Sequence, residues 1–197
     1  MDKIRKERSS SRFLEYEFLN ERGINEVNMI IAAAEASFGE GSLQEQKPML
    51  AHIAGLLLIY LEPGEVYCVL IELLKSSKEK MEDLEIKAMI RWHIPLSSED
   101  KLRLHQAFGT SYLMTTLRKK RSLATHMSQI GFELRNYSSA AFDTIGARFM
   151  PLYIAIDVLL MYLVEGVKIV FRYAYAILKT KKDFIKKTCT DPTHLME

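Results

Sequence analysis

The chain has little cysteine, glycine or proline, and each shortage excludes a class of protein. Its two cysteines, Cys68 and Cys189, lie far apart and form no CxxC or Cys/His pattern. They therefore indicate a reducing compartment, with neither a disulfide scaffold nor a zinc site. Nine glycines and five prolines in 197 residues favour long regular elements. The first residues are basic and polar with no apolar stretch, which argues against a secretory signal.

Long hydrophobic runs are also missing. The two most apolar stretches, residues 53–61 and 152–164, are shorter than the roughly 20 residues that a membrane-spanning helix needs, and Asp157 interrupts the second. Both therefore predict buried core helices. Hydrophobic residues make up 48% of the chain and charged residues 26%, a composition typical of globular proteins. We expect a soluble, cytoplasmic protein with one domain or one two-lobed domain.

Charge is nearly balanced overall but gathered locally. A net charge of only +2 argues against a nucleic-acid binder. The basic run at 118–121 also lacks the interleaved aromatic residues of single-strand binders, so no nucleic-acid partner is expected. Basic residues gather at 1–12, 118–121 and 179–187. Such patches suit acidic surfaces such as phosphoinositide headgroups, although a solvated loop or helix end is the commoner explanation.

Apolar residues recur at helical spacing along most of the chain, and no strand alternation longer than a few residues appears. The sequence therefore predicts an all-α fold. A basic lead-in at 1–12, a helical domain at 13–187 and a tail at 188–197 are expected. The expected helices span about 24–38, 48–61, 66–74, 78–92, 98–117, 122–136, 138–149 and 152–164, followed by one long helix that starts at 165.

No self-contained catalytic motif is found. The chain has no GxSxG, Walker A or GxGxxG pattern, and its five histidines show no metal-ligand spacing. No metal and no cofactor are therefore expected. His52 lies in the most apolar predicted helix, which favours a hydrogen-bonded core histidine over a catalytic base.

Three late basic residues share one face of a predicted helix. Lys168, Arg172 and Lys179 fall within roughly 40° of one another at about 100° per residue. A cationic stripe of this kind is either a set of solvated side chains or an anion-binding site. From the residues alone, the solvated interpretation is favoured.

The order of these features resembles the TBC domain, the all-α fold that activates Rab GTPases. The resemblance depends on several short stretches at consistent separations, and residues 76–140 align poorly. These stretches are LNERG at 19–23, IAGLLL at 53–58, YCVL at 67–70, PL at 151–152, LVEG at 163–166, FR at 171–172 and AILK at 176–179. The implied fold is a TBC-like multi-helix domain, and the implied partner is a Rab-family small GTPase.

In this family two groups act in trans on the GTPase. An arginine from an IxxDxxR helix stabilises the transition state and accelerates hydrolysis by roughly 10³ to 10⁵, and a glutamine from a YxQ motif positions the attacking water. Here the register set by Ile53 and Ala54 puts Pro48 at the glutamine position, with Gln44 and Gln46 out of register. No IxxDxxR helix is found. The resemblance therefore implies a partial domain that lacks the family's N-terminal part and has no catalytic residue.

Proline at the glutamine position is similar to the atypical TBC proteins that carry a C-terminal TLDc domain, the Skywalker type. In those proteins a cationic groove at the last helix binds phosphoinositide headgroups, and the resemblance makes Lys168 and Arg172 the phosphoinositide-binding candidates. The groove's third arginine and the TLDc domain have no counterpart in this sequence.

Three interpretations stay open. The first is a divergent Rab GTPase-activating domain, weak or inactive in catalysis, that binds a Rab in vesicle trafficking. The second is a phosphoinositide-binding peripheral adaptor on vesicle membranes. The third is a helical scaffold with no GTPase contact.

Overall fold

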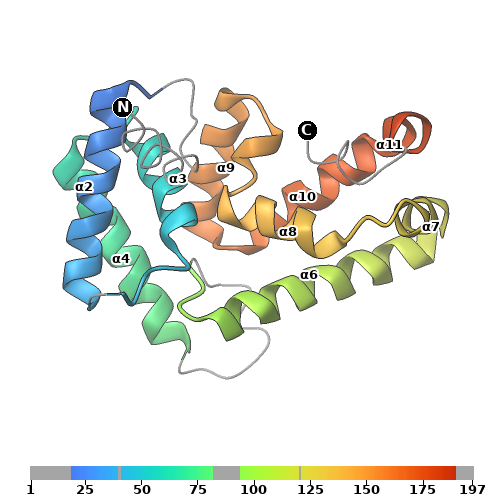
Figure 1. The fold of residues 1–197 in the computed structure, drawn as a ribbon, viewed down its shortest axis with the longest axis horizontal. Coiled ribbons are helices and arrows are strands. Elements are labelled where there is room, and N and C mark those ends of the chain that lie inside the picture. The colour runs from blue at the N-terminus through green and yellow to red at the C-terminus, as the bar shows by residue number, and fades with distance from the viewer. Residues whose placement is uncertain (1–18, 40, 82–93, 120, 190–197) are drawn as a thin grey trace, which may run out of the picture.

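The computed structural model describes residues 19–39, 41–81, 94–119 and 121–189, and these form α-helices joined by short turns, without a strand among them (Figure 1). The predicted all-α fold is confirmed. The predicted lead-in at 1–12, most of the helix at 78–92 and most of the tail lie outside the described residues. The helices are α2 (Glu21–Phe38), α3 (Lys47–Leu57), α4 (Pro63–Met81), α6 (Ser98–Lys119), α7 (Arg121–Gln129), α8 (Leu134–Asp143), α9 (Leu152–Glu165), α10 (Lys168–Thr180) and α11 (Lys182–Thr188), with a 3-10 turn η2 (Ala147–Phe149).

Helices α2, α3 and α4 pack together at one end of the molecule (Figure 1). Asn20 starts α2, because its side-chain oxygen accepts a hydrogen bond from the backbone N–H of Gly23 at 2.9 Å. The inner face of α2 buries residues at helical spacing, namely Val27, Ile30, Ile31 and Ala34. Every residue of α3 from Met49 onward is buried, so α3 is the central helix that its apolar sequence predicts.

Helix α8 packs against both α6 and α10 (Figure 1), and aromatic rings from the three helices contact one another. Phe108 of α6 contacts the rings of Phe142 and Phe171, with centroid distances of 6.1 and 5.5 Å. Tyr137 of α8 donates a hydrogen bond to the carbonyl of Ala174 in α10 at 2.9 Å. Burial raises the pKa of the Tyr137 hydroxyl, so this donor keeps its proton.

Two of the predicted helices are divided, and glycine explains one of the divisions. The helix expected at 122–136 is divided, because Gly131 has a φ of 70°, a left-handed conformation in which few other residues are stable. The boundary expected between residues 164 and 165 lies close to the observed one: Glu165 ends α9, Gly166 turns the chain with a φ of 76°, and α10 begins at Lys168. The long helix expected after this boundary is divided, because α10 ends at Thr180 and a separate helix, α11, begins at Lys182.

A further predicted boundary is wrong. The segments expected as separate helices at 66–74 and 78–92 begin as one helix, since α4 is continuous from Pro63 to Met81.

Within the described part of the chain, none of the helices has the length and apolar character needed to cross a bilayer.

Candidate functional site

The position that the resemblance assigns to the glutamine finger lies in the first turn of α3. Pro48 suits this position because the first helical N–H groups have no partner within the helix. Its carbonyl oxygen lies 2.8 Å from Nδ1 of His52. A carbonyl can only accept, so this contact places the proton on Nδ1. His52 is buried, and burial lowers its pKa, so the predicted core role of this neutral histidine is confirmed.

The nearest glutamine points into the protein. Gln46 is only 4% exposed, and its Nε2 donates to the carbonyl of Pro95 at 2.9 Å. Its Oε1 has no hydrogen-bond partner among the described residues. Gln46 also lines a cavity of about 10 Å³ together with Lys101 and Asp143, close to the size of one water. Gln44 is exposed on the turn before α3. Gln46 is therefore unable to present its amide to a bound GTPase.

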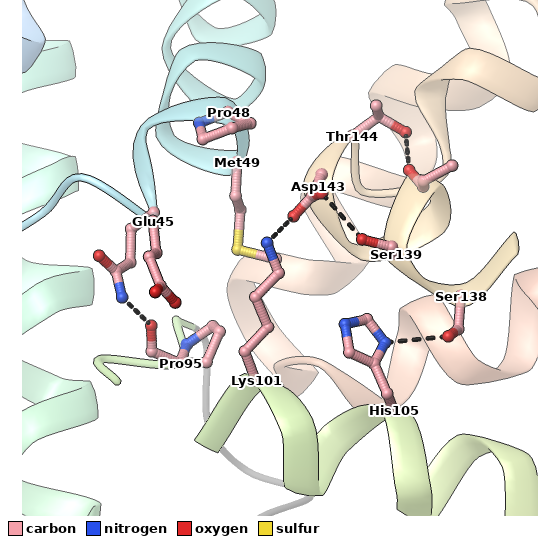
Figure 2. A network of polar contacts seen from close by, with 12 residues as sticks. Glu45, Pro48, Met49, Pro95, Lys101, His105, Ser138, Ser139, Asp143 and Thr144 are labelled. Carbon is pink, nitrogen blue, oxygen red and sulfur yellow. Dashed lines mark hydrogen bonds and ion pairs between the residues drawn. The ribbon is translucent and has the colours of Figure 1, made fainter. Parts of the chain in front are cut away.

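A polar network joins α3 to α6 and α8 beside this cavity (Figure 2). Lys101 Nζ pairs with Asp143 Oδ1 at 2.6 Å, and Ser139 donates to the other oxygen of Asp143 at 3.2 Å. Ser98 donates to Glu45, which connects the start of α6 to the turn before α3. Each charged side chain of the network has a partner within it. The network therefore has a structural role, connecting the segments that it joins.

One pair in the network has the composition of a nucleophile and its base, but its geometry does not suit catalysis. His105 Nδ1 lies 2.9 Å from the hydroxyl of Ser138 (Figure 2), and that hydroxyl donates to the carbonyl of Arg135 at 3.0 Å. The histidine is therefore the donor to the serine. Ser138 is only 1% exposed, out of reach of a substrate. Burial, together with the charge of Lys101, lowers the pKa of His105.

The two phosphoinositide-binding candidates converge on one carboxylate oxygen. Lys168 Nζ lies 2.6 Å from Oε2 of Glu165, and Nη1 of Arg172 lies 3.1 Å from the same atom. Their predicted common face is therefore confirmed, while their binding role stays a prediction. The hydrogen bond from Lys168, then the charge of Arg172, lower the pKa of Glu165.

Glu165 was missed by the sequence reasoning, although a signal existed. The i, i+3 spacing of Glu165 and Lys168 would suit an ion pair within one helix. Instead, Glu165 ends α9 and Lys168 starts α10, and the turn at Gly166 brings them together. Lys179 shares the same side of α10 but lies roughly 16 Å along the axis from Lys168, at 1.5 Å per residue. The cluster is therefore two cations and one anion.

The geometry defines an all-α domain whose described residues include neither a nucleophile–base pair open to solvent nor a group of three side chains that could hold a metal ion. The family model of the RabGAP TBC domain matches residues 45–195, about three quarters of the chain, including Pro48, Lys168 and Arg172. The chain therefore belongs to the RabGAP TBC domain family. No solved structure gives a significant match.

Family membership sets the kind of activity and the kind of partner. It implies a Rab GTPase as partner and a function of the GTPase-activating type. The match is to the family as a whole, so kinship with the TLDc-bearing subgroup stays a prediction, as do the domain bounds 13–187. Helix α2 precedes the matched segment but packs against α3 and α4, and Glu35 pairs with Lys47 at 2.9 Å.

Proposed function

We propose that this domain binds a Rab-family GTPase and adds little or nothing to its rate of GTP hydrolysis. In this role it recruits or retains the GTPase at the cytoplasmic face of vesicle membranes. The observation that supports this most strongly is the environment of Pro48. A proline side chain has no amide with which to orient water, and the carbonyl of Pro48 already bonds to His52.

The neighbouring glutamines do not replace the missing amide. Gln46 is buried and bonded to Pro95. Turning its amide outward would break that bond and leave the Pro95 carbonyl unpaired, at a cost of about 1–3 kcal/mol. Gln44 is exposed, but it lies four residues before Pro48, and no described contact fixes its side chain. An arginine finger is worth roughly 10³ to 10⁵ in rate, and the sequence has no IxxDxxR motif to supply one.

The test separates binding from catalysis. The purified chain is titrated against a panel of Rab proteins loaded with a non-hydrolysable GTP analogue, and single-turnover GTP hydrolysis is measured with the same panel. We expect saturable binding of at least one Rab with a hydrolysis rate close to its intrinsic value. A large acceleration that Gln44→Ala or Gln46→Ala abolishes would contradict the proposal. Absence of binding to every Rab would favour the scaffold interpretation.

A second candidate function follows from the shared contact of Lys168 and Arg172 with Glu165. Two cations that already meet at one anionic oxygen are spaced to meet at one oxygen of a phosphate. We propose that a phosphoinositide headgroup replaces the carboxylate of Glu165 between them. The headgroup carries more negative charge than the single carboxylate, so the exchange is favourable near a membrane.

Vesicle sedimentation tests this second function. Vesicles with and without phosphatidylinositol bisphosphate are compared, with Lys168→Glu/Arg172→Glu as the loss variant. We expect this variant to lose the phosphoinositide-dependent part of binding, and Glu165→Gln to strengthen it because the competing charge is removed. The matched control is Arg22→Glu/Arg103→Glu, which makes the same change in net charge at two other exposed, ion-paired arginines. Equal binding by wild type and the loss variant would remove this candidate.

A further inference from the structure

The end of α10 and the short helix α11 contain a dense group of lysines. Five lysines and one aspartate fall between residues 179 and 187, a net charge of +4, which exceeds the +2 of the whole chain. The rest of the chain is therefore net negative. The exposed residues that form what we call the α11 patch are Lys179, Lys181, Phe184, Lys186 and Lys187.

The packing of α11 determines which residues face outward. Ile185 is buried and fixes the inner side of the helix. Lys181, Phe184 and Lys187 recur at intervals of three, so they form one row along the helix surface. Phe184 is 57% exposed in the middle of this row. The row is therefore a basic strip with one apolar ring at its centre.

The lysines of the patch differ from other surface cations of the molecule. Arg22, Arg103 and Lys168 each pair with a carboxylate on the same helix or on the preceding one. Lys179, Lys181, Lys186 and Lys187 form no ion pair with any other residue in the described ranges. Their charge is thus not neutralised locally, and it is available to an acidic partner.

The end of α6 and the start of α7 lie at the same end of the molecule as α11 (Figure 1). Helix α7 packs against α11, and Nε2 of His126 lies 3.1 Å from the carbonyl of Cys189, just after α11 (Figure 1). Helix α6 ends and α7 begins within the run Arg-Lys-Lys-Arg at 118–121. This end lies opposite α2 and α4 (Figure 1). The fold therefore brings the start of α7, distant in sequence, beside α11.

We propose that the α11 patch docks on an anionic lipid bilayer, with its lysines at headgroup level and the Phe184 ring in the interfacial layer. Basic residues near an anionic leaflet each gain affinity from its surface potential, and an exposed aromatic ring suits the boundary between headgroups and acyl chains. Binding to single-stranded nucleic acid would favour several stacked aromatic rings, whereas Phe184 is the one ring in the row. This surface is separate from Lys168 and Arg172, and it goes beyond the proposed Rab binding.

Sedimentation of the full chain with phosphatidylcholine vesicles, with and without phosphatidylserine and without phosphoinositide or GTPase, tests the proposal. We expect binding only when phosphatidylserine is present, and weaker binding as salt is raised. Lys181→Glu/Lys187→Glu should weaken binding at least roughly 30-fold, the factor expected for two basic residues near an anionic leaflet. Phe184→Ala should weaken it by roughly tenfold through lost apolar burial.

Matched variants keep the test specific. Arg22→Glu/Arg103→Glu changes net charge equally on α2 and the first turns of α6, and Tyr60→Ala removes another exposed aromatic ring. Both should bind as wild type. Three results would overturn the proposal: unchanged binding of Lys181→Glu/Lys187→Glu, equal losses in the control variants, or wild-type binding to single-stranded DNA but not to anionic vesicles.

Discussion

Gln46 donates its side-chain amide to the backbone carbonyl of Pro95 at 2.9 Å, although 49 residues separate the two in sequence. This bond connects the turn before α3 to the segment that leads into α6. It holds the nearest glutamine amide in the interior of the protein. The same contact thus stabilises the fold and keeps the side-chain amide of Gln46, two residues before Pro48, from orienting a water at the surface.

The bond makes Gln46 a stability residue. Gln46→Ala leaves the Pro95 carbonyl unpaired, and we expect it to lower the free energy of unfolding by about 1–3 kcal/mol. Gln44→Ala, at an exposed position, should change it by no more than about 0.5 kcal/mol. Urea denaturation followed by circular dichroism measures both. Equal effects of the two substitutions would show that the Gln46 amide contributes nothing to folding.

Pro48→Gln places an amide at the finger position without disturbing α3, because the first N–H groups of a helix need no internal partner. We expect single-turnover GTP hydrolysis by a bound Rab to rise roughly tenfold, far below the 10³ to 10⁵ that an arginine finger supplies. Pro48→Ala is the control for loss of the ring alone. The family register assigned to Pro48 would be wrong if the two variants hydrolysed GTP at the same rate.

Gly166 has a φ of 76° and a ψ of −162°, a conformation essentially restricted to glycine. Gly166→Ala should therefore cost about 1–3 kcal/mol of the free energy of unfolding. It should also weaken the phosphoinositide binding proposed for Lys168 and Arg172, because the turn positions α10 on α9. Gly109→Ala is the matched control. Gly109 lies within α6 with open space around an added Cβ, so alanine there should stabilise by about 0.5–1 kcal/mol. Thermal or urea denaturation measures the free energy of unfolding, which should fall for Gly166→Ala and rise for Gly109→Ala.

Stability should fall as the pH drops below about 6.5, the ordinary pKa of histidine. Burial lowers the pKa of His52 and His105 in the folded state, so the unfolded chain binds more protons over this range. Their contribution is complete above the ordinary pKa and is lost as the pH falls toward the lowered values. Urea denaturation at a series of pH values measures how the free energy of unfolding depends on pH. In the double variant His52→Gln/His105→Gln this free energy should change less with pH than in wild type. An identical pH dependence would exclude both histidines as its source.

Helical periodicity was sufficient to predict the fold class, because it reports which residues face the core. The inner face of α2 and the apolar circumference of α3 follow directly from spacing. The break at Gly131 was not predicted, since glycine inside a helical pattern is also compatible with a continuous helix. Which glycines adopt a positive φ depends on the packing of neighbouring helices, so it does not follow from the local sequence.

Only those features of the candidate site that depend on local residue spacing were predicted from the sequence. The common face of Lys168 and Arg172 follows from an interval of four residues. Their shared partner Glu165 lies beyond a turn, and the orientation of Gln46 depends on Pro95, far along the chain. Long-range hydrogen bonds of this kind have no periodic signature, so their prediction needs the tertiary arrangement.

The two cysteines differ in exposure, so one of them is a natural site for attaching a fluorescent label. Cys68 is exposed on α4, whereas Cys189 is buried beside α11. A maleimide dye should thus react at Cys68 alone, on α4, a helix that lies at the opposite end of the molecule from α11 (Figure 1). Energy transfer from such a dye to labelled lipid would then give the orientation of the bound molecule directly, with the lysine-rich pole left chemically untouched.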